Sequence, residues 1–365
     1  MTLYFYFARK FATTFAGLLG IFLLFYGMLD MIEVIRKLGT DRVGFLEILI
    51  LTVLNVPGGI YQILPLIVIL ATLVLFLGLA RSSELVVARA SGRSALRSLM
   101  APVVVAILLG VISVGAFNPI VAATSKQYDL LLNKYRKGTT SVLSVSREGL
   151  WLRQGGDSGQ TVIRATRANL DGTEFFDVTF LGFGLDGTPT FRIEALSATL
   201  TTGAWDARNV KEWRFDVAGN AEKQATTASR LRIPSNLTRE EIRDGFGSPS
   251  AIPIWELPNY IKRLEAAGFS GRRHRVWFHT ELAKPLMLVA MVLIGAGFTM
   301  RHTRFGRTGL MVMMALIMGF SIYFIRNFAV VLGENGQLPV LLAAWAPPVA
   351  GILLSLGLVL HMEDG

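Results

Sequence analysis

The sequence predicts an α-helical membrane protein with six transmembrane helices and an all-β domain inserted between the third and the fourth. Of the 365 residues, 52% are hydrophobic and only 17% are charged, and the mean hydropathy is +0.50. A soluble domain of this size is less apolar, so lipid is the expected solvent for much of the chain. Six runs reach the roughly twenty apolar residues that cross the hydrocarbon. The segment between the third and fourth runs alternates with the period of two that strands show.

The six apolar runs define the expected spans. The second run is unusually long and contains Pro57, Gly58, Gly59 and Pro65. It therefore predicts a kinked, tilted helix or a bent entry from the outer surface. The expected spans lie near residues 11–32, 48–79, 99–122, 282–300, 308–331 and 338–361.

Positive residues in the short loops orient the chain, because Lys and Arg resist transfer across the membrane. One set of loops carries Arg9, Lys10, Arg81, Arg89, Arg93, Arg97, Arg301, Arg304 and Arg307. The loop 333–337 carries no positive residue. We therefore expect both termini in the cytoplasm and the inserted domain outside. One outer loop breaks the rule, because it contains Arg36, Lys37 and Arg42.

The inserted domain is expected from Ser141 to Pro234, where short alternating runs are separated by Gly, Asp and Asn. This spacing fits a sandwich, a jelly roll or an open barrel. Two helices are expected to flank it, at residues 119–137 and from Ile254 to Gly268. The domain boundaries that follow are 1–123, with a cytoplasmic coupling helix over 81–98, then 124–280, then 281–365.

Several kinds of chemistry are excluded or not supported. The chain has no cysteine, so it has no disulfide, thiolate zinc site or cysteine nucleophile. It contains neither a phosphate-binding GxxxxGK[ST] loop nor an HExxH motif, and its four histidines have no metal-ligand spacing. We expect a non-enzymatic chain without a cofactor or metal of its own. A membrane-bound hydrolase lacks a paired acid and base or a nucleophile.

The loop after the second span combines a short helical segment with an exposed carboxylate and several arginines. Such a helix can dock in a groove of a partner, with Glu84 pairing with a base there. Composition alone favours an interfacial helix whose arginines meet anionic lipid. The segment 81–92, Arg-Ser-Ser-Glu-Leu-Val-Val-Ala-Arg-Ala-Ser-Gly, resembles the coupling segment of the lipopolysaccharide export permeases, the LptF/LptG (YjgP/YjgQ) family. Two further stretches, REGLWL from Arg147 and LPNYIKRL from Leu257, resemble the LptG branch.

The resemblance covers the whole chain and implies a function. It implies a permease subunit of an ATP-driven transporter that extracts lipopolysaccharide from the outer leaflet of the inner membrane of a Gram-negative bacterium and passes it to a periplasmic bridge. The inserted domain would be a periplasmic β-jellyroll. The implied partners are an LptF-like permease, two copies of an LptB-like ATPase that binds ATP and Mg, and an LptC-like membrane-anchored protein; no nucleic acid is implied. A different class stays open: a non-transporting mechanotransmission or scaffold protein coupled to an ATPase.

The resemblance also assigns roles to residues. Glu84 matches the acidic residue that inserts into the ATPase groove, with Arg81, Ser83 and Arg89 beside it. Arg36 and Lys37 match basic positions that contact lipopolysaccharide, and Arg42 extends this loop, although snorkelling at a helix end is the alternative. A further basic position of the family is Asp30 here. Candidate residues for an acyl-chain groove are Phe176, Phe180 and Phe191, although aromatics at this spacing are mostly core.

Two cations near the last three spans need separate explanations. Arg326 lies within the fifth span, where an unpaired arginine costs about 2.5 to 3.5 kcal/mol at the bilayer centre. It is expected to contact lipopolysaccharide phosphate or carboxylate near Asp30 or Glu33, or to form an intrachain ion pair. Lys284 begins the fourth span and is expected to snorkel.

Overall fold

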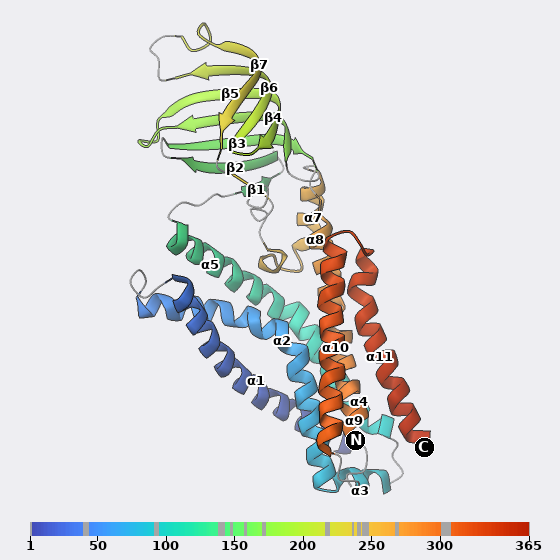
Figure 1. Cartoon of the computed structure of the whole chain (residues 1–365). Helices are drawn as coiled ribbons and strands as arrows, with labels where there is room; N and C mark the ends of the chain where they lie inside the picture. Colours follow the sequence, from blue (N-terminus) through green and yellow to red (C-terminus); the bar gives the residue numbers. More distant parts are fainter. Residues whose placement is uncertain are drawn as a thin grey trace. The chain divides into compact units, whose positions relative to one another are not determined.

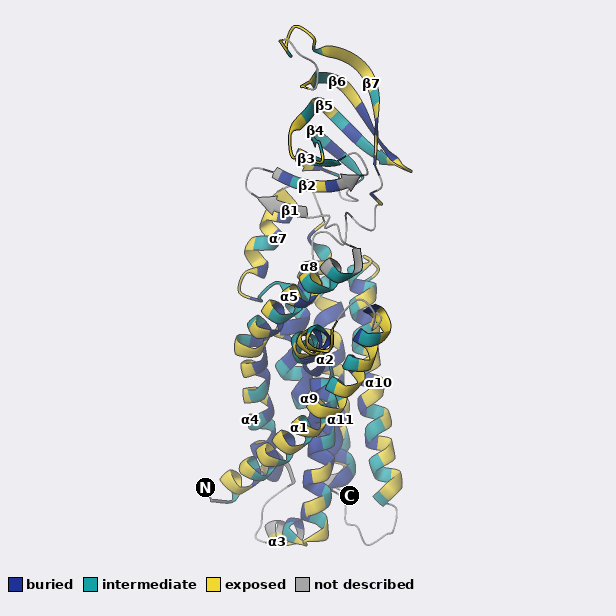
Figure 2. Cartoon of the chain, turned by 90° about the vertical axis from the view of Figure 1, so that its left-hand side faces the viewer, coloured by how far each residue is buried: buried dark blue, intermediate teal, exposed yellow. Residues whose placement is uncertain are grey.

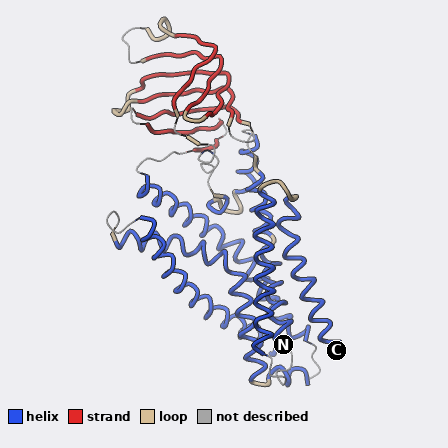
Figure 3. Tube along the Cα trace, in the orientation of Figure 1, coloured by secondary structure: helices blue, strands red, loops and turns tan. Residues whose placement is uncertain are grey.

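The computed structural model consists of two compact units. It describes residues 2–38, 44–90, 95–137, 143–146, 149–156, 159–169, 173–215, 220–235, 237–238, 242, 248–266, 270–300 and 308–364. The helical unit comprises Met1–Tyr128, Ser250–Ile254 and Arg272–Gly365, and the sheet unit comprises Asp129–Pro249 and Trp255–Gly271. Helices make up the first unit and strands dominate the second (Figure 3).

The helical unit contains the spans that the apolar runs predicted (Figure 1). Five stretches are long and apolar enough to cross a membrane, and the pair α8 and α9, bent by 48°, makes a sixth if it is counted as one span. The third span is continuous from α4 through the π-helical turn η1 into α5. The helices are α1 (Thr2–Leu38), α2 (Phe45–Arg81), α3 (Glu84–Ala90), α4 (Ala95–Ile112), η1 (Ser113–Phe117), α5 (Asn118–Lys137), α8 (Arg272–Leu282), α9 (Lys284–Thr299), α10 (Thr308–Glu334) and α11 (Val340–Asp364).

Proline explains two departures from straight helices. Pro57 and Pro65 lie inside α2, and Figure 1 shows this helix turning within its length, as the sequence predicts. Pro285 lies in the first turn of α9. Because proline has no N–H and fits best in the first turn of a helix, α9 begins at Lys284 and a break at Ala283 separates it from α8, so the predicted span 282–300 corresponds to α9.

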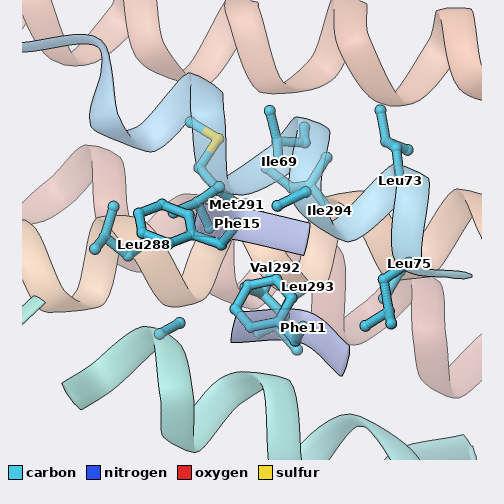
Figure 4. Packing of buried hydrophobic residues seen from close by; sticks show 14 of the residues in the cluster. Phe11, Phe15, Ile69, Leu73, Leu75, Leu288, Met291, Val292, Leu293 and Ile294 are labelled. Atoms are coloured by element: carbon cyan, nitrogen blue, oxygen red, sulfur yellow. The ribbon is translucent and has the colours of Figure 1, made fainter. Parts of the chain in front are cut away.

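Helix α9 forms the centre of the helical unit. It is apolar on all sides, and such a helix is normally buried in the middle of a bundle. Twelve of its residues are buried, including Leu288 and Met291, and Figure 2 shows it surrounded by the other helices. Figure 4 shows Phe11 and Phe15 of α1 packed with Ile69 of α2 around this helix.

Between its flanking helices, the sheet unit is built from strands, as predicted. Its seven strands form one antiparallel sheet in which each strand pairs with the next along the chain. This order is a meander and, among the described strands, contains no Greek-key crossover of the kind a jelly roll has. The strands are β1 (Leu143–Ser146), β2 (Gly149–Gly156), β3 (Gly159–Ala168), β4 (Glu174–Phe183), β5 (Pro189–Thr201), β6 (Ala204–Arg214) and β7 (Thr226–Pro234).

Glycines close two of the hairpin turns. Gly187 and Gly203 have φ values of +79° and +78°, which only glycine adopts without strain. The core of the sheet unit centres on Trp205, whose ring centroid lies 4.8 Å from that of Phe175 and 6.2 Å from that of Phe180.

The predicted flanking helices are both present. The first is α5, and the second is α7 (Leu257–Ala266), whose residues Leu257, Ile261 and Leu264 are buried as their spacing indicates. Leu264 joins the core around Trp205. Gly268, the predicted end of α7, lies outside the described residues.

A close approach between α4 and α9 yields a test of this packing. A Cβ atom at Gly110 would lie 2.5 Å from the Cα atom of Pro285, so Gly110→Ala forces two helix backbones apart. We expect the substitution to lower the free energy of unfolding by about 1 to 3 kcal/mol, the usual cost of overpacking. Thermal unfolding of the purified chain in detergent measures this change.

Gly357→Ala is the matched control, because nothing lies within 4 Å of a Cβ atom at that position in α11. An equal melting temperature for Gly110→Ala and the wild-type chain would contradict the contact between α4 and α9.

Candidate functional site

The described residues of the predicted coupling helix, 81–98, belong to more than one helix. Helix α2 continues to Arg81, a turn at Ser82 and Ser83 follows, and α3 begins at Glu84. Ser83 has a φ of +58°, an uncommon conformation for a residue with a side chain. Arg81 and Ser83 are exposed. Arg89 lies in α3, but its side chain is outside the described part of the structure.

Glu84 is bound within the chain by three residues. Lys10 Nζ lies 3.0 Å from its Oε1 and 3.1 Å from its Oε2. The Tyr6 hydroxyl donates to Oε2 at 2.9 Å, and Ser82 Oγ lies 2.7 Å from Oε1. Burial raises the pKa of the Glu84 carboxyl, but the hydrogen bonds from Ser82, Lys10 and Tyr6 outweigh it, and the pKa lies below its usual value. Glu84 is therefore ionised at neutral pH and joins α3 to the start of α1.

The predicted basic residues at the other end of α1 are partly described. Arg36 and Lys37 occupy the last turn of α1 and are exposed. Lys37 Nζ lies 2.7 Å from Glu33 Oε1, in an (i, i+4) pair along the helix surface. Arg42 lies outside the described residues. Arg36 and Lys37 therefore lie side by side at the end of α1, and Lys37 is paired with Glu33.

Asp30 occupies the position where the family pattern suggested a basic residue, and it has a contact of its own. Its side chain is buried, and Asn55 Nδ2 of α2 donates to its Oδ1 at 2.6 Å. This bond joins α1 to α2. Among the described contacts, Asp30 pairs with Asn55 and Glu33 pairs with Lys37, so neither carboxylate is the partner of Arg326.

Arg326 instead lines a cavity of about 280 Å³ between α2, α8, α9 and α10. It is half-buried, and its Nη1 donates to Asn327 Oδ1 at 3.0 Å. Two further donors of the lining, Trp277 Nε1 and Thr280 Oγ1, have no hydrogen-bond partner within the described part of the chain. The same cavity is lined by Glu281 and Lys284.

A buried ion pair forms one wall of this cavity, and sequence reasoning missed it. Lys284 and Glu281 are 4% and 0% exposed, and Lys284 Nζ lies 3.0 Å from Glu281 Oε1. The ammonium lies 3.0 Å from the centroid of the Tyr61 ring, and the Tyr61 hydroxyl donates to Glu281. Asn118 of α5 donates to the same carboxylate at 3.3 Å. The expectation that Lys284 snorkels is wrong, because its partners hold it inside the bundle.

The available signal was the spacing of two opposite charges, three residues apart, at the start of an apolar run. A charge in a membrane helix is costly unless it is paired, so such a spacing indicates an internal pair. Tyr61 and Asn118 gave no comparable signal, since they come from distant parts of the sequence.

The three aromatics of the predicted acyl-chain groove do not share one surface. Phe180 is fully buried in the core of the sheet unit, and Phe191 packs at the edge of that core. Phe176 is only partly buried, and the guanidinium of Arg167 lies 5.6 Å from the centroid of its ring. Only Phe180 and Phe191 are therefore on the inner, apolar side of the sheet.

Comparison with known proteins now adds to this geometry. The family model described as lipopolysaccharide export system permease LptF/LptG matches residues 5–361. The chain belongs to this family. It is 24% identical over 344 residues to the lipopolysaccharide export system permease protein LptG of Escherichia coli strain K12, covering 92% of this chain and 91% of that protein. The same values hold for LptG of Escherichia coli O6:H1 strain CFT073.

Membership in the LptF/LptG family agrees with the fold. The chain is a multi-pass inner-membrane protein of a permease family. The members of this family are transport subunits without catalysis of their own. The motifs that resembled the family in the sequence lie within the matched residues.

The ion pair at the break between α8 and α9 yields a stability prediction. Lys284→Met leaves the Glu281 carboxylate buried without its cation, and removing one partner of a buried pair typically costs about 3 to 5 kcal/mol. We expect a clearly lower melting temperature for the purified chain in detergent. The double variant Glu281→Gln with Lys284→Met removes both charges and should recover part of the loss. If Lys284→Met melted like the wild-type chain, the pair would not stabilise the bundle.

Proposed function

We propose that the chain is the transmembrane permease subunit of an ATP-driven transporter. It extracts lipopolysaccharide from the outer leaflet of the inner membrane and passes it to a periplasmic β bridge for delivery to the outer membrane. An LptB-like ATPase, present in two copies, binds ATP and Mg and hydrolyses the nucleotide. The chain itself requires no cofactor.

One observation carries this proposal: α1 bears two kinds of site, one at each end. Its first turns contact Glu84 of the coupling segment through Lys10, and its last turn bears Arg36 and Lys37. Lys10 and Arg36 are 26 residues apart on α1, so they lie about 39 Å apart along the helix at 1.5 Å per residue. The hydrocarbon is only about 30 Å thick. In a membrane, the Glu84 contact and the basic pair therefore lie on opposite sides, as coupling to a cytoplasmic ATPase and contact with an outer-leaflet lipid require.

The basic pair suits the phosphates of lipid A. A guanidinium forms paired hydrogen bonds to phosphate, and Arg36 is exposed. Lys37 is held by Glu33, but exposed pairs of this kind contribute only about 0.3 to 0.5 kcal/mol. A phosphate, with more negative charge than a carboxylate, can displace Glu33. Arg42 continues the same outer loop in the sequence.

The cavity beside Arg326 supplies a second set of donors for the head group. Its volume of about 280 Å³ is enough for a phosphate and part of a sugar, not for a whole glycolipid. Arg326 would contribute the charge, and Trp277 and Thr280 contribute neutral donors that lack partners within the described residues.

The partners proposed for the chain match its uncovered surfaces. Only 11% of the apolar stretch of α1 and 17% of that of α10 are buried within the chain, against 61% for α2. An LptF-like permease is proposed to pack near these two helices, so that the two permeases together enclose a cavity for the lipid. In the sheet unit, β1 and β7 are the edge strands. An LptC-like protein is proposed to continue the sheet at such an edge in the periplasm.

Glu84 gives the first test of this proposal. Glu84→Ala removes the carboxylate proposed to pair with a base of the ATPase. Loss of one partner of a buried charged contact at an interface costs about 2 to 5 kcal/mol, so we expect at least about tenfold less ATPase to co-purify. Glu47→Ala is the control, because Glu47 lies in the first turn of α2, at the opposite end of that helix. Normal co-purification and normal export by Glu84→Ala would disprove the coupling role.

Passage of lipid through the sheet unit is tested by photo-crosslinking. A photoreactive residue at Phe191, on the inner side of the sheet, should form an adduct with lipopolysaccharide that depends on ATP. The same residue at Phe176, beside Arg167 and away from the inner core, should form far less. Equal labelling at both positions, or none at Phe191, would favour a scaffold that moves its periplasmic domain without carrying lipid.

A further inference from the structure

Four side chains form a compact cluster where α1 meets the turn before α3. We call Tyr6, Lys10, Ser82 and Glu84 the Glu84 clasp. Lys10 Nζ contacts both carboxylate oxygens at 3.0 and 3.1 Å and also lies 3.1 Å from the Tyr6 hydroxyl. The clasp is partly accessible, since the side chains of Lys10 and Glu84 are 33% and 32% exposed.

We propose that the clasp is the mechanical link through which the coupling helix α3 moves the first span, with Lys10 and Tyr6 acting as positioning residues on α1. This inference rests on the proposed docking of Glu84 on an ATPase. It adds a path from that contact to the basic residues at the far end of α1.

The packing of α1 leaves its most apolar stretch largely uncovered by the rest of the chain. Only 11% of that stretch is buried within the chain, and near its far end Asp30 is bonded to Asn55 of α2. The residues buried near its start, Phe7, Phe11 and Phe15, make apolar contacts, which are not directional. The bonds of Lys10 and Tyr6 to Glu84 are directional and charge-assisted. They therefore define where the start of α1 lies relative to α3.

The stiffness of α1 carries a displacement to its other end. The helix is continuous from Thr2 to Leu38 and contains no proline. Sharp kinks in helices arise at proline, at Gly/Ser pairs or at π-bulges. A tilt imposed at Lys10 therefore also moves Arg36 and Lys37.

Docking of a partner cation on Glu84 is compatible with a lasting bond to Lys10. A carboxylate offers about four acceptor positions, and the clasp uses four contacts. A bond between two charged groups is stronger than one from a neutral hydroxyl. An incoming arginine would thus replace Tyr6 or Ser82 before Lys10. The link to α1 persists while the ATPase pulls on α3.

The test uses the complete transporter, reconstituted in vesicles with its partner permease and ATPase. Lys10→Met should leave the complex assembled and its ATP hydrolysis within twofold of wild type. The amount of lipopolysaccharide released per ATP hydrolysed should fall about fivefold, the lower end of the change that coupling between two sites typically produces. Lys10→Arg keeps the charge and should restore the ratio. Arg9→Met is the matched control, because Arg9 is an exposed cation on the neighbouring position of α1.

Two outcomes would overturn the inference. One is a Lys10→Met transporter that releases as much lipopolysaccharide per ATP as wild type. The other is loss of the ATPase from the complex, which would make Lys10 part of the docking site. These outcomes are separate from failure of the proposed function. If Glu84→Ala uncouples transport and Lys10→Met does not, only the link through α1 is wrong.

A distance measurement supplies a readout that general destabilisation would not mimic. The chain has no cysteine, so Ile21→Cys and Val87→Cys introduce two unique labelling sites, both exposed, on α1 and α3. In the assembled transporter, a non-hydrolysable ATP analogue shifts both labels together, so their distance distribution should stay narrow. With Lys10→Met added, the nucleotide should broaden or shift that distribution. The same distribution in both proteins would contradict the link.

Discussion

The buried contact between Glu281 and Lys284 determines how the helices of the membrane unit meet. In a bilayer, polar groups find no water, so each must be satisfied inside the protein. Tyr61 of α2 and Asn118 of α5 both donate to Glu281, and the ring of Tyr61 faces the ammonium of Lys284. One carboxylate thus brings together the second, third and fourth spans. It does so at the point where the proline of α9 breaks the fourth.

The same constraint shapes the second and first spans. Asp30 is buried in α1 and is paired by Asn55 of α2. Glu84 accepts a hydrogen bond from Lys10 of α1. The first span is therefore joined to its neighbours by polar bonds near both ends, while its middle faces outward. This arrangement leaves α1 the least enclosed of the spans while the position of its ends stays defined.

Local properties of the sequence predicted most of the fold. The spans follow from run length and apolar content, and the flanking helices α5 and α7 follow from spacing, because each signal lies within one segment. Lys284 was misplaced although its partner Glu281 lies only three residues before it, whereas its contact with Tyr61, far away in the sequence, had no local signal. The expected alternation of buried and exposed residues also fails in strand β4. Asp177 has a φ of +52°, and Phe175 before it and Val178 after it are both buried. A strict period of two would have put these two residues on opposite faces.

The candidate site residues also divide into those that local sequence signals predicted and those that depend on residues far away in the sequence. Glu84, Arg36 and Lys37 were found from motif and loop position, since each depends on nearby residues. Their contacts with Lys10 and Glu33 differ in this respect: the pair with Glu33 could be found from its (i, i+4) spacing, and the pair with Lys10 could not. The cavity beside Arg326 could not be found from sequence, because four helices line it.

The position of α9 in the chain has a consequence for biogenesis. Spans one to three are synthesised before the sheet unit, and α9, which fills the centre of their packing, is synthesised after it. Until α8 and α9 are inserted, the first three spans have no partner for their inner apolar faces, and Tyr61 and Asn118 lack Glu281 of α8. The sheet need not wait, because each strand pairs with the one made just before it. The extramembrane part can therefore mature during synthesis, whereas the helical unit is completed only once its central helix has been inserted.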